Sequence, residues 1–133
     1  MSNSLRLSAA AHVAFVPISD KDKALAFYRD QLGLAFIEDQ SPFALIFDLD
    51  GTTFRVTFAG EFKPQPFTIL GWQVSDIAAT VGELTDAGVT FNRYPGMNDS
   101  HPLAIWTAPG GTQVAWFNDP FGNVLSLQQN PGN

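Results

Sequence analysis

Short runs of alternating apolar and polar residues, separated by turn residues, dominate the chain and predict β-strands. In the first half these runs cover residues 12–18, 34–39, 43–47 and 52–58. Between the first two runs, apolar residues recur at helical spacing from about residue 20 to residue 32. Asp20 is placed to cap the start of this helix and Gly33 to end it. The pattern predicts the order β-α-β-β-β, with Asp48-Leu49-Asp50-Gly51 as a hairpin turn.

The same order of elements returns after a break at residues 61–66, where two prolines predict a linker. Strands are predicted over residues 67–74 and 89–94 and on both sides of the turn at residues 119–122, and a helix is predicted from Ser75-Asp76 to Gly88. Gly51 and Gly122 take equivalent places in the last hairpin of each half. A duplicated unit explains this agreement, with an insertion at about residues 95–111 in the second copy.

These elements predict an α+β fold made of two tandem βαβββ modules. The modules would form a cupped mixed sheet with the helices on its outer face and a groove on its inner face. The expected boundaries are a loose tail at residues 1–10, a first module at 11–60, a linker at 61–66 and a second module at 67–129. With 133 residues, the chain is expected to be one domain overall.

Composition narrows the classes of partner. The net charge is −6 and no basic cluster is present, so we expect no nucleic-acid partner. The chain has no cysteine, which removes disulfides, thiolate nucleophiles and cysteine-ligated metals. No apolar run reaches the roughly 20 residues that a membrane-spanning helix needs, and the first residues lack the apolar region of a signal peptide. We therefore expect a cytoplasmic protein without a membrane partner.

Two segments of the chain resemble the vicinal oxygen chelate superfamily, which includes glyoxalases, extradiol dioxygenases and bleomycin-resistance proteins. The first joins Ile18-Ser19-Asp20 to Ala26-Phe27-Tyr28-Arg29-Asp30-Gln31-Leu32-Gly33-Leu34, and the second is Asp119-Pro120-Phe121-Gly122-Asn123-Val124-Leu125-Ser126-Leu127. The resemblance runs from about residue 11 to residue 129. It implies the paired-module fold and, in the metal-dependent members, a metal held in the groove by one side chain from the first and one from the last strand of each half.

The metal positions implied by this resemblance fall on Val13, Arg55, Ile69 and Ser126. Val and Ile offer no lone pair, Arg is a permanent cation, and a neutral Ser is a weak ligand for a divalent metal. We therefore expect no bound cofactor. The alternative is a divalent metal held by displaced ligands at His12, His101 or Glu38.

Strand alternation predicts which side chains face the groove. The candidate ligand-binding residues are Val13, Phe15, Thr53, Arg55, Thr57, Ile69, Gln73, Ser126 and Gln128, together with Trp106 from the insertion. Arg55 allows two interpretations, an ion pair with a carboxylate across the groove or recognition of an anionic group of a ligand. The aromatic residues Phe15, Trp106, Trp116 and Phe121 could stack on a planar ligand or pack in the core.

Three functions remain open. The first is a metal-free, bleomycin-resistance-like protein that binds a small aromatic or apolar molecule, including an anionic one. The second is a metal-dependent lyase, isomerase or dioxygenase with displaced ligands, and no catalytic residue is assigned for it. The third is an interaction module whose groove is filled by its own side chains. The resemblance also implies a homodimer, and the groove could close within one chain or across two.

Overall fold

The computed structural model describes residues 6–132, and its strands form two four-stranded mixed sheets. The first sheet has the order β1-β4-β3-β2 and the second the order β5-β8-β7-β6. Their strands are β1 (Val13–Ile18), β2 (Ala35–Gln40), β3 (Ala44–Leu49), β4 (Thr52–Phe58), β5 (Thr68–Gln73), β6 (Trp106–Thr107), β7 (Gln113–Asn118) and β8 (Val124–Gln129). In each sheet one edge strand, β1 or β5, runs parallel to its neighbour, and the other pairs are antiparallel. The predicted α+β fold of two repeated modules is confirmed, with a separate sheet in each module.

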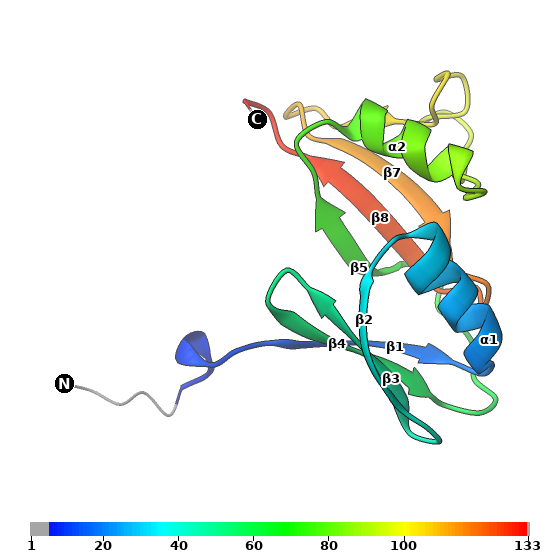
Figure 1. Cartoon of the computed structure of the whole chain (residues 1–133). Helices are drawn as coiled ribbons and strands as arrows, with labels where there is room; N and C mark the ends of the chain where they lie inside the picture. The colour runs from blue at the N-terminus through cyan, green and yellow to red at the C-terminus, as the bar shows by residue number, and fades with distance from the viewer. Residues whose placement is uncertain (1–5, 133) are drawn as a thin grey trace.

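Both predicted helices are present and begin at the predicted caps. Helix α1 (Lys21–Ala24) continues into a π-helical segment, η2 (Leu25–Gln31), and α2 spans Ile77–Asp86. The Asp20 side chain accepts a hydrogen bond from Lys23 N (2.9 Å), and Asp76 accepts one from Ala79 N (3.0 Å). The helices of the two modules lie on the same side of the two sheets (Figure 1). The opposite side of both sheets is therefore not covered by a helix.

The hydrophobic core lies between the helices and the sheets and holds residues of both modules. Strand alternation places Val16 and Ile18 of β1 in this core, as expected from the sequence. The first helix packs on both modules, because the Tyr28 ring meets Phe54 of the first sheet (5.5 Å between centroids) and the Phe27 ring meets Phe117 of the second (6.3 Å). The helix therefore fixes the position of one sheet relative to the other.

The predicted strand over residues 89–94 is wrong. The segment forms one isolated bridge, between Phe91 and Phe117, and the fourth strand of the second sheet is β6 instead. The reason lies in Asn98, which is 1% exposed. Its side chain accepts from Tyr94 N (2.7 Å) and donates to Asn92 O (2.9 Å) and Ala104 O (2.6 Å). These backbone groups are bonded within the inserted loop rather than in a β-ladder.

The N-terminal residues lie outside the two sheets. Of the predicted tail, residues 1–5 are outside the described part of the chain, and residues 6–10 are exposed. They include one 3₁₀ turn, η1 (Leu7–Ala9), and the segment extends away from both sheets (Figure 1). Within residues 6–132, no helix has the length and apolar character needed to cross a membrane.

Candidate functional site

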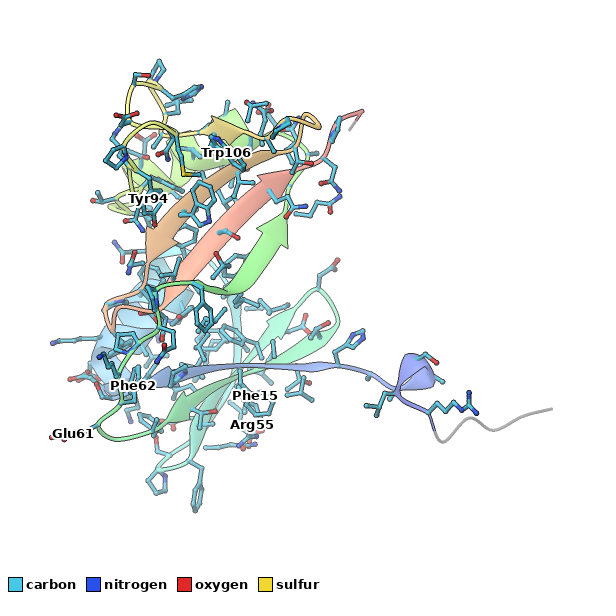
Figure 2. All side chains as sticks on the ribbon, turned by 180° about the vertical axis from the view of Figure 1, so that it is seen from behind. Phe15, Arg55, Glu61, Phe62, Tyr94 and Trp106 are labelled. Atoms are coloured by element: carbon cyan, nitrogen blue, oxygen red, sulfur yellow. The ribbon has the colours of Figure 1, made fainter. Side chains whose placement is uncertain are left out.

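The face of the two sheets opposite the helices, called the open face below, holds most of the predicted ligand-binding residues. Figure 2 shows this face with Phe15 and Arg55 on the first sheet and Trp106 at the second. Val13 and Phe15 are 47% and 57% exposed, unusual for apolar side chains of this size in a strand. The first sheet therefore presents an apolar surface beside the Arg55 side chain.

Arg55 lies in the interior strand β4, between Phe15 of β1 and Ile46 of β3 in the sheet register. Its side chain is partly buried, and its Nη1 donates to Gln40 Oε1 at 3.3 Å. The Gln40 amide in turn donates to Glu38 Oε2 at 3.1 Å. A neutral amide therefore separates the guanidinium from the Glu38 carboxylate in this polar row.

The ion pair expected as one interpretation of Arg55 does not form within residues 6–132. The ion pairs in this part of the chain are Lys21–Asp39 and Arg29–Asp30, both on the surface. Arg55 is also not at a sheet edge, because β4 has a neighbour on each side. The structure thus leaves a partly buried guanidinium with a single long hydrogen bond to a neutral group.

The second sheet contributes an aromatic cluster to the open face. Trp116 of β7 meets Tyr94 edge to face (5.5 Å between centroids) and Trp106 at a tilt of 35° (6.0 Å). Beside this cluster is a cavity of about 230 Å³ lined by Pro66, Phe67, Thr68, Tyr94, Met97, Trp116 and Val124. Of the predicted stacking residues, the structure places Trp106 and Trp116 in contact here. Phe121 instead packs against the core.

The sequence did not indicate Phe67, Tyr94 and Met97 as site residues. The sequence predicts Tyr94 at the end of a strand and Met97 in the insertion, and neither is among the predicted groove-facing residues. Only the folded loop around Asn98 places them against Trp116. Only their aromatic or thioether side chains could have indicated a binding site, and such side chains are also common in hydrophobic cores.

Ser126 lies at the centre of the second sheet, between Gly71 of β5 and Trp116 of β7 in the register. It is 8% exposed, and no hydrogen bond to its hydroxyl is formed within residues 6–132. Gly71 is not among the predicted groove residues, although alternation places it on the same face as Gln73.

The remaining predicted residues take varied positions. Thr53 is exposed, whereas the Thr57 hydroxyl donates to the Arg55 carbonyl at 3.2 Å. Gln73 and Gln128 are joined through Asn130, with distances of 3.1 and 2.9 Å. The predicted alternation fails at Ile69, because the register with β8 shifts between Thr68 and Leu70, and Ile69 packs against the core.

The donor set on the open face does not fit a divalent metal. Among residues 6–132, no group of three or more His, Cys, Asp or Glu side chains could hold a metal ion. Of the displaced candidates, His12 is exposed ahead of β1. His101 Nδ1 accepts hydrogen bonds from Leu103 N (3.0 Å) and Ile105 N (3.3 Å), so this nitrogen stabilises the inserted loop.

A buried polar network elsewhere belongs to the hairpin turn rather than to the open face. The Tyr28 hydroxyl donates to Asp119 Oδ2 at 2.6 Å, and burial followed by the Asp119 charge raises the pKa of Tyr28 far above its ordinary value. Asp119 also accepts from the backbone N–H groups of Phe121 and Asn123 (both 2.9 Å). The tyrosine therefore stays protonated and serves as a structural donor.

Comparisons with known proteins identify the relatives of this chain. The family model of the Glyoxalase/Bleomycin resistance protein/Dioxygenase superfamily matches residues 9–127. A member of that superfamily from Sphaerobacter thermophilus is 26% identical, with a TM-score of 0.71 over 92% of this chain and 98% of the other. No curated protein matches.

Two further solved structures share the fold at lower identity. A glyoxalase family protein from Bacillus anthracis is 18% identical, with a TM-score of 0.72 over 98% of this chain and 99% of the other. A lactoylglutathione lyase from Agrobacterium tumefaciens is 15% identical, with a TM-score of 0.71 over 91% of this chain and 93% of the other. At these identities the likeness concerns the fold alone.

Proposed function

Because the chain belongs to the Glyoxalase/Bleomycin resistance protein/Dioxygenase superfamily, we propose that it uses the open face to bind a small aromatic or apolar molecule carrying an acidic group, without a bound metal. The observation that carries this proposal is Arg55. Its guanidinium is partly buried on an interior strand, and its one hydrogen bond in the described chain is to the neutral Gln40 amide.

The physical reason is the cost of withdrawing a cation from water. A partly buried guanidinium without a carboxylate partner loses hydration that a neutral amide replaces only in part. A carboxylate or phosphate of a ligand can accept two parallel N–H bonds from the planar guanidinium, which a single Gln40 oxygen cannot do. Arg55 is therefore expected to gain most from an anionic ligand.

The apolar part of the ligand has two surfaces available on the open face. Phe15 lies beside Arg55 in the register and is 57% exposed, and the second sheet presents the cluster of Trp116, Tyr94 and Trp106. Offset stacking or edge-to-face contact of one aromatic pair contributes about 0.5–1.5 kcal/mol beyond area burial. An aromatic acid meets both requirements, whereas a purely apolar molecule leaves Arg55 with its Gln40 hydrogen bond and no anionic partner.

The test is a titration of aromatic acids against wild type and Arg55→Ala by calorimetry. With benzoate, phenylacetate and 2-naphthoate as probes, Arg55→Ala should weaken binding by about tenfold or more, as loss of a charged hydrogen bond predicts. Arg29→Ala is the matched control, since it removes an exposed Arg that is paired with Asp30. Equal weakening by both variants, or no binding by wild type, contradicts the proposal.

The metal-dependent enzyme is the competing function, and elemental analysis separates the two. Protein purified without chelator should contain no stoichiometric transition metal. One equivalent of metal that is lost on His12→Ala or His101→Ala would replace our proposal with an enzyme that has displaced ligands. A chain that binds none of the acids and no metal would instead fit the interaction module.

We extend the proposal to a cytoplasmic homodimer that covers part of the open face. Val13, Phe15, Phe67 and Met97 expose 47%, 57%, 59% and 44% of their surface, and a second copy would bury such apolar surface. Sedimentation equilibrium tests this, with a dimer expected at micromolar concentration. A monomer at every concentration would mean that the site is complete within one chain.

A further inference from the structure

Gly71 and Ser126 form a small niche in the open face of the second sheet. They are register partners on the parallel strands β5 and β8. A side-chain carbon at Gly71 would lie 2.8 Å from Ser126 Oγ, closer than such contacts allow. The hydroxyl therefore occupies the space that any larger residue at position 71 would take. We call this pair the Gly71–Ser126 niche.

The Ser126 hydroxyl is buried but has no partner within the described chain. The residue is 8% exposed, and no hydrogen bond to its side chain is formed within residues 6–132. Buried hydroxyls are normally bonded, because an unpaired one costs about 1–3 kcal/mol. The nearby amide of Gln128 donates to Asn130 at 2.9 Å instead. No group within residues 6–132 satisfies this hydroxyl, so a bound molecule can supply its partner.

The hydroxyl can be reached from the open face. Every side-chain nitrogen or oxygen that is fully enclosed in residues 6–132 has a hydrogen-bond partner. Because Ser126 Oγ has none, this atom is not fully enclosed and keeps some contact with the surface of the open face. On the other side of Ser126 lies Trp116, whose ring belongs to the aromatic cluster.

We infer that the Gly71–Ser126 niche recognises a neutral hydrogen-bonding group, such as a phenolic hydroxyl, a carbonyl or an amide, on an aromatic ring lying against Trp116. The cross-strand row of Gly71, Ser126 and Trp116 contains no charged residue, so it offers a charged group no partner. A serine hydroxyl can donate or accept, which suits all three groups.

This inference rests on the proposed function and narrows its ligand class. The expected ligand is an aromatic compound with an acid for Arg55 and a neutral polar substituent for Ser126. These two residues stand four positions after Gly51 and Gly122, the equivalent turn glycines of the two modules. The repeat thus places one charged and one neutral contact at matching points of the two sheets.

Phenol and toluene are the probes, because they have nearly the same shape and differ in one hydroxyl group. Titrations followed by the ¹H–¹⁵N signals of Gly71 and Ser126 should show phenol binding wild type about threefold to tenfold more tightly than toluene, as one net hydrogen bond predicts. Ser126→Ala should remove this preference and leave toluene binding unchanged. The same preference should survive in Arg55→Ala, because neither probe is anionic.

Gly71→Ala provides the second variant, since it displaces the hydroxyl without removing it. It should also abolish the preference for phenol, whereas Gly82→Ala, which meets nothing within 4 Å, should keep it. The inference is overturned if phenol and toluene bind wild type equally, if Ser126→Ala keeps the preference, or if neither probe binds. It is overturned too if Ser126→Ala lowers the melting temperature, because the hydroxyl would then have an internal partner.

The two proposals fail separately. If Ser126→Ala removes the preference for phenol while Arg55→Ala leaves benzoate affinity unchanged, the niche is supported and the binding of an anionic group by Arg55 is refuted. If Arg55→Ala weakens benzoate binding while Ser126→Ala keeps the preference for phenol, the proposed function is supported and the niche is refuted.

Discussion

The hydrogen bond from Tyr28 to Asp119 gives a sharp prediction of stability. Tyr28 is 0% exposed and lies on the first helix, and Asp119 is 5% exposed at the last hairpin turn. The bond is 2.6 Å long and joins the two modules. Tyr28→Phe removes one donor from a buried carboxyl group and keeps the ring that packs on Phe54. Any loss of stability therefore reports the hydroxyl and not the aromatic packing.

The expected loss in the free energy of unfolding follows from the hydrogen-bond partners that Asp119 keeps. After the substitution, Asp119 still accepts from Phe121 N (2.9 Å), Asn123 N (2.9 Å) and the Asn123 side-chain amide (2.8 Å). The carboxyl is therefore not left without partners, and the loss should be that of one hydrogen bond to a charged group. We expect the free energy of unfolding to fall by about 2 kcal/mol, within the range for such bonds.

Urea denaturation followed by tryptophan fluorescence measures this change. Tyr94→Phe is the control, because the Tyr94 hydroxyl is only partly buried and its contact with the Asn92 amide is 3.3 Å long. The control should lose less than about 1 kcal/mol. If Tyr28→Phe also stays within that limit, or changes the denaturant slope as well as the midpoint, the bond does not join the modules as described.

Two further predictions concern the inserted loop and the first sheet. Asn98→Ala should lower the free energy of unfolding by about 2–3 kcal/mol, because it leaves buried backbone groups of the loop without partners. Urea denaturation measures this change, and a loss below about 1 kcal/mol would show that the loop keeps its structure without the Asn98 side chain. Hydrogen bonds from the Ser41 hydroxyl and backbone, followed by Lys21, lower the pKa of Asp39. The charged Asp39 carboxylate therefore stabilises the fold above the ordinary aspartate pKa, and this stabilisation is lost as the pH falls through the lowered pKa of Asp39. In an NMR titration Ser41→Ala should raise the Asp39 pKa, and an unchanged pKa would refute this cause.

Local chemistry predicted most of the fold. Asp20 and Asp76 cap the two helices because a carboxylate at that position bonds the free N–H groups of the first turn, a rule that needs no tertiary information. Alternation placed Val16 and Ile18 on the covered side of β1, and their burial confirms it. These features depend on near neighbours in the sequence, which is why they could be predicted.

The features that were missed depend on distant partners or on register. Asn98 was unremarkable in the sequence, because its bonds to Asn92 and Ala104 exist only once the loop has closed. The shift at Ile69 could not be predicted, since a bulge is defined by the neighbouring strand. Whether Arg55 has a carboxylate partner likewise depends on distances across strands, and only the structure gives them.

The packing of the first helix on both sheets means that the two modules cannot vary independently. Phe27 contacts Phe117 of β7, and the neighbouring residue Trp116 belongs to the open face on the other side of the same strand. A change in the size of Phe27 would shift β7 and so alter the spacing between the Trp116 cluster and Arg55. If one ligand spans the open face as proposed, the ligand length that fits both ends depends on Phe27, a buried side chain of the core.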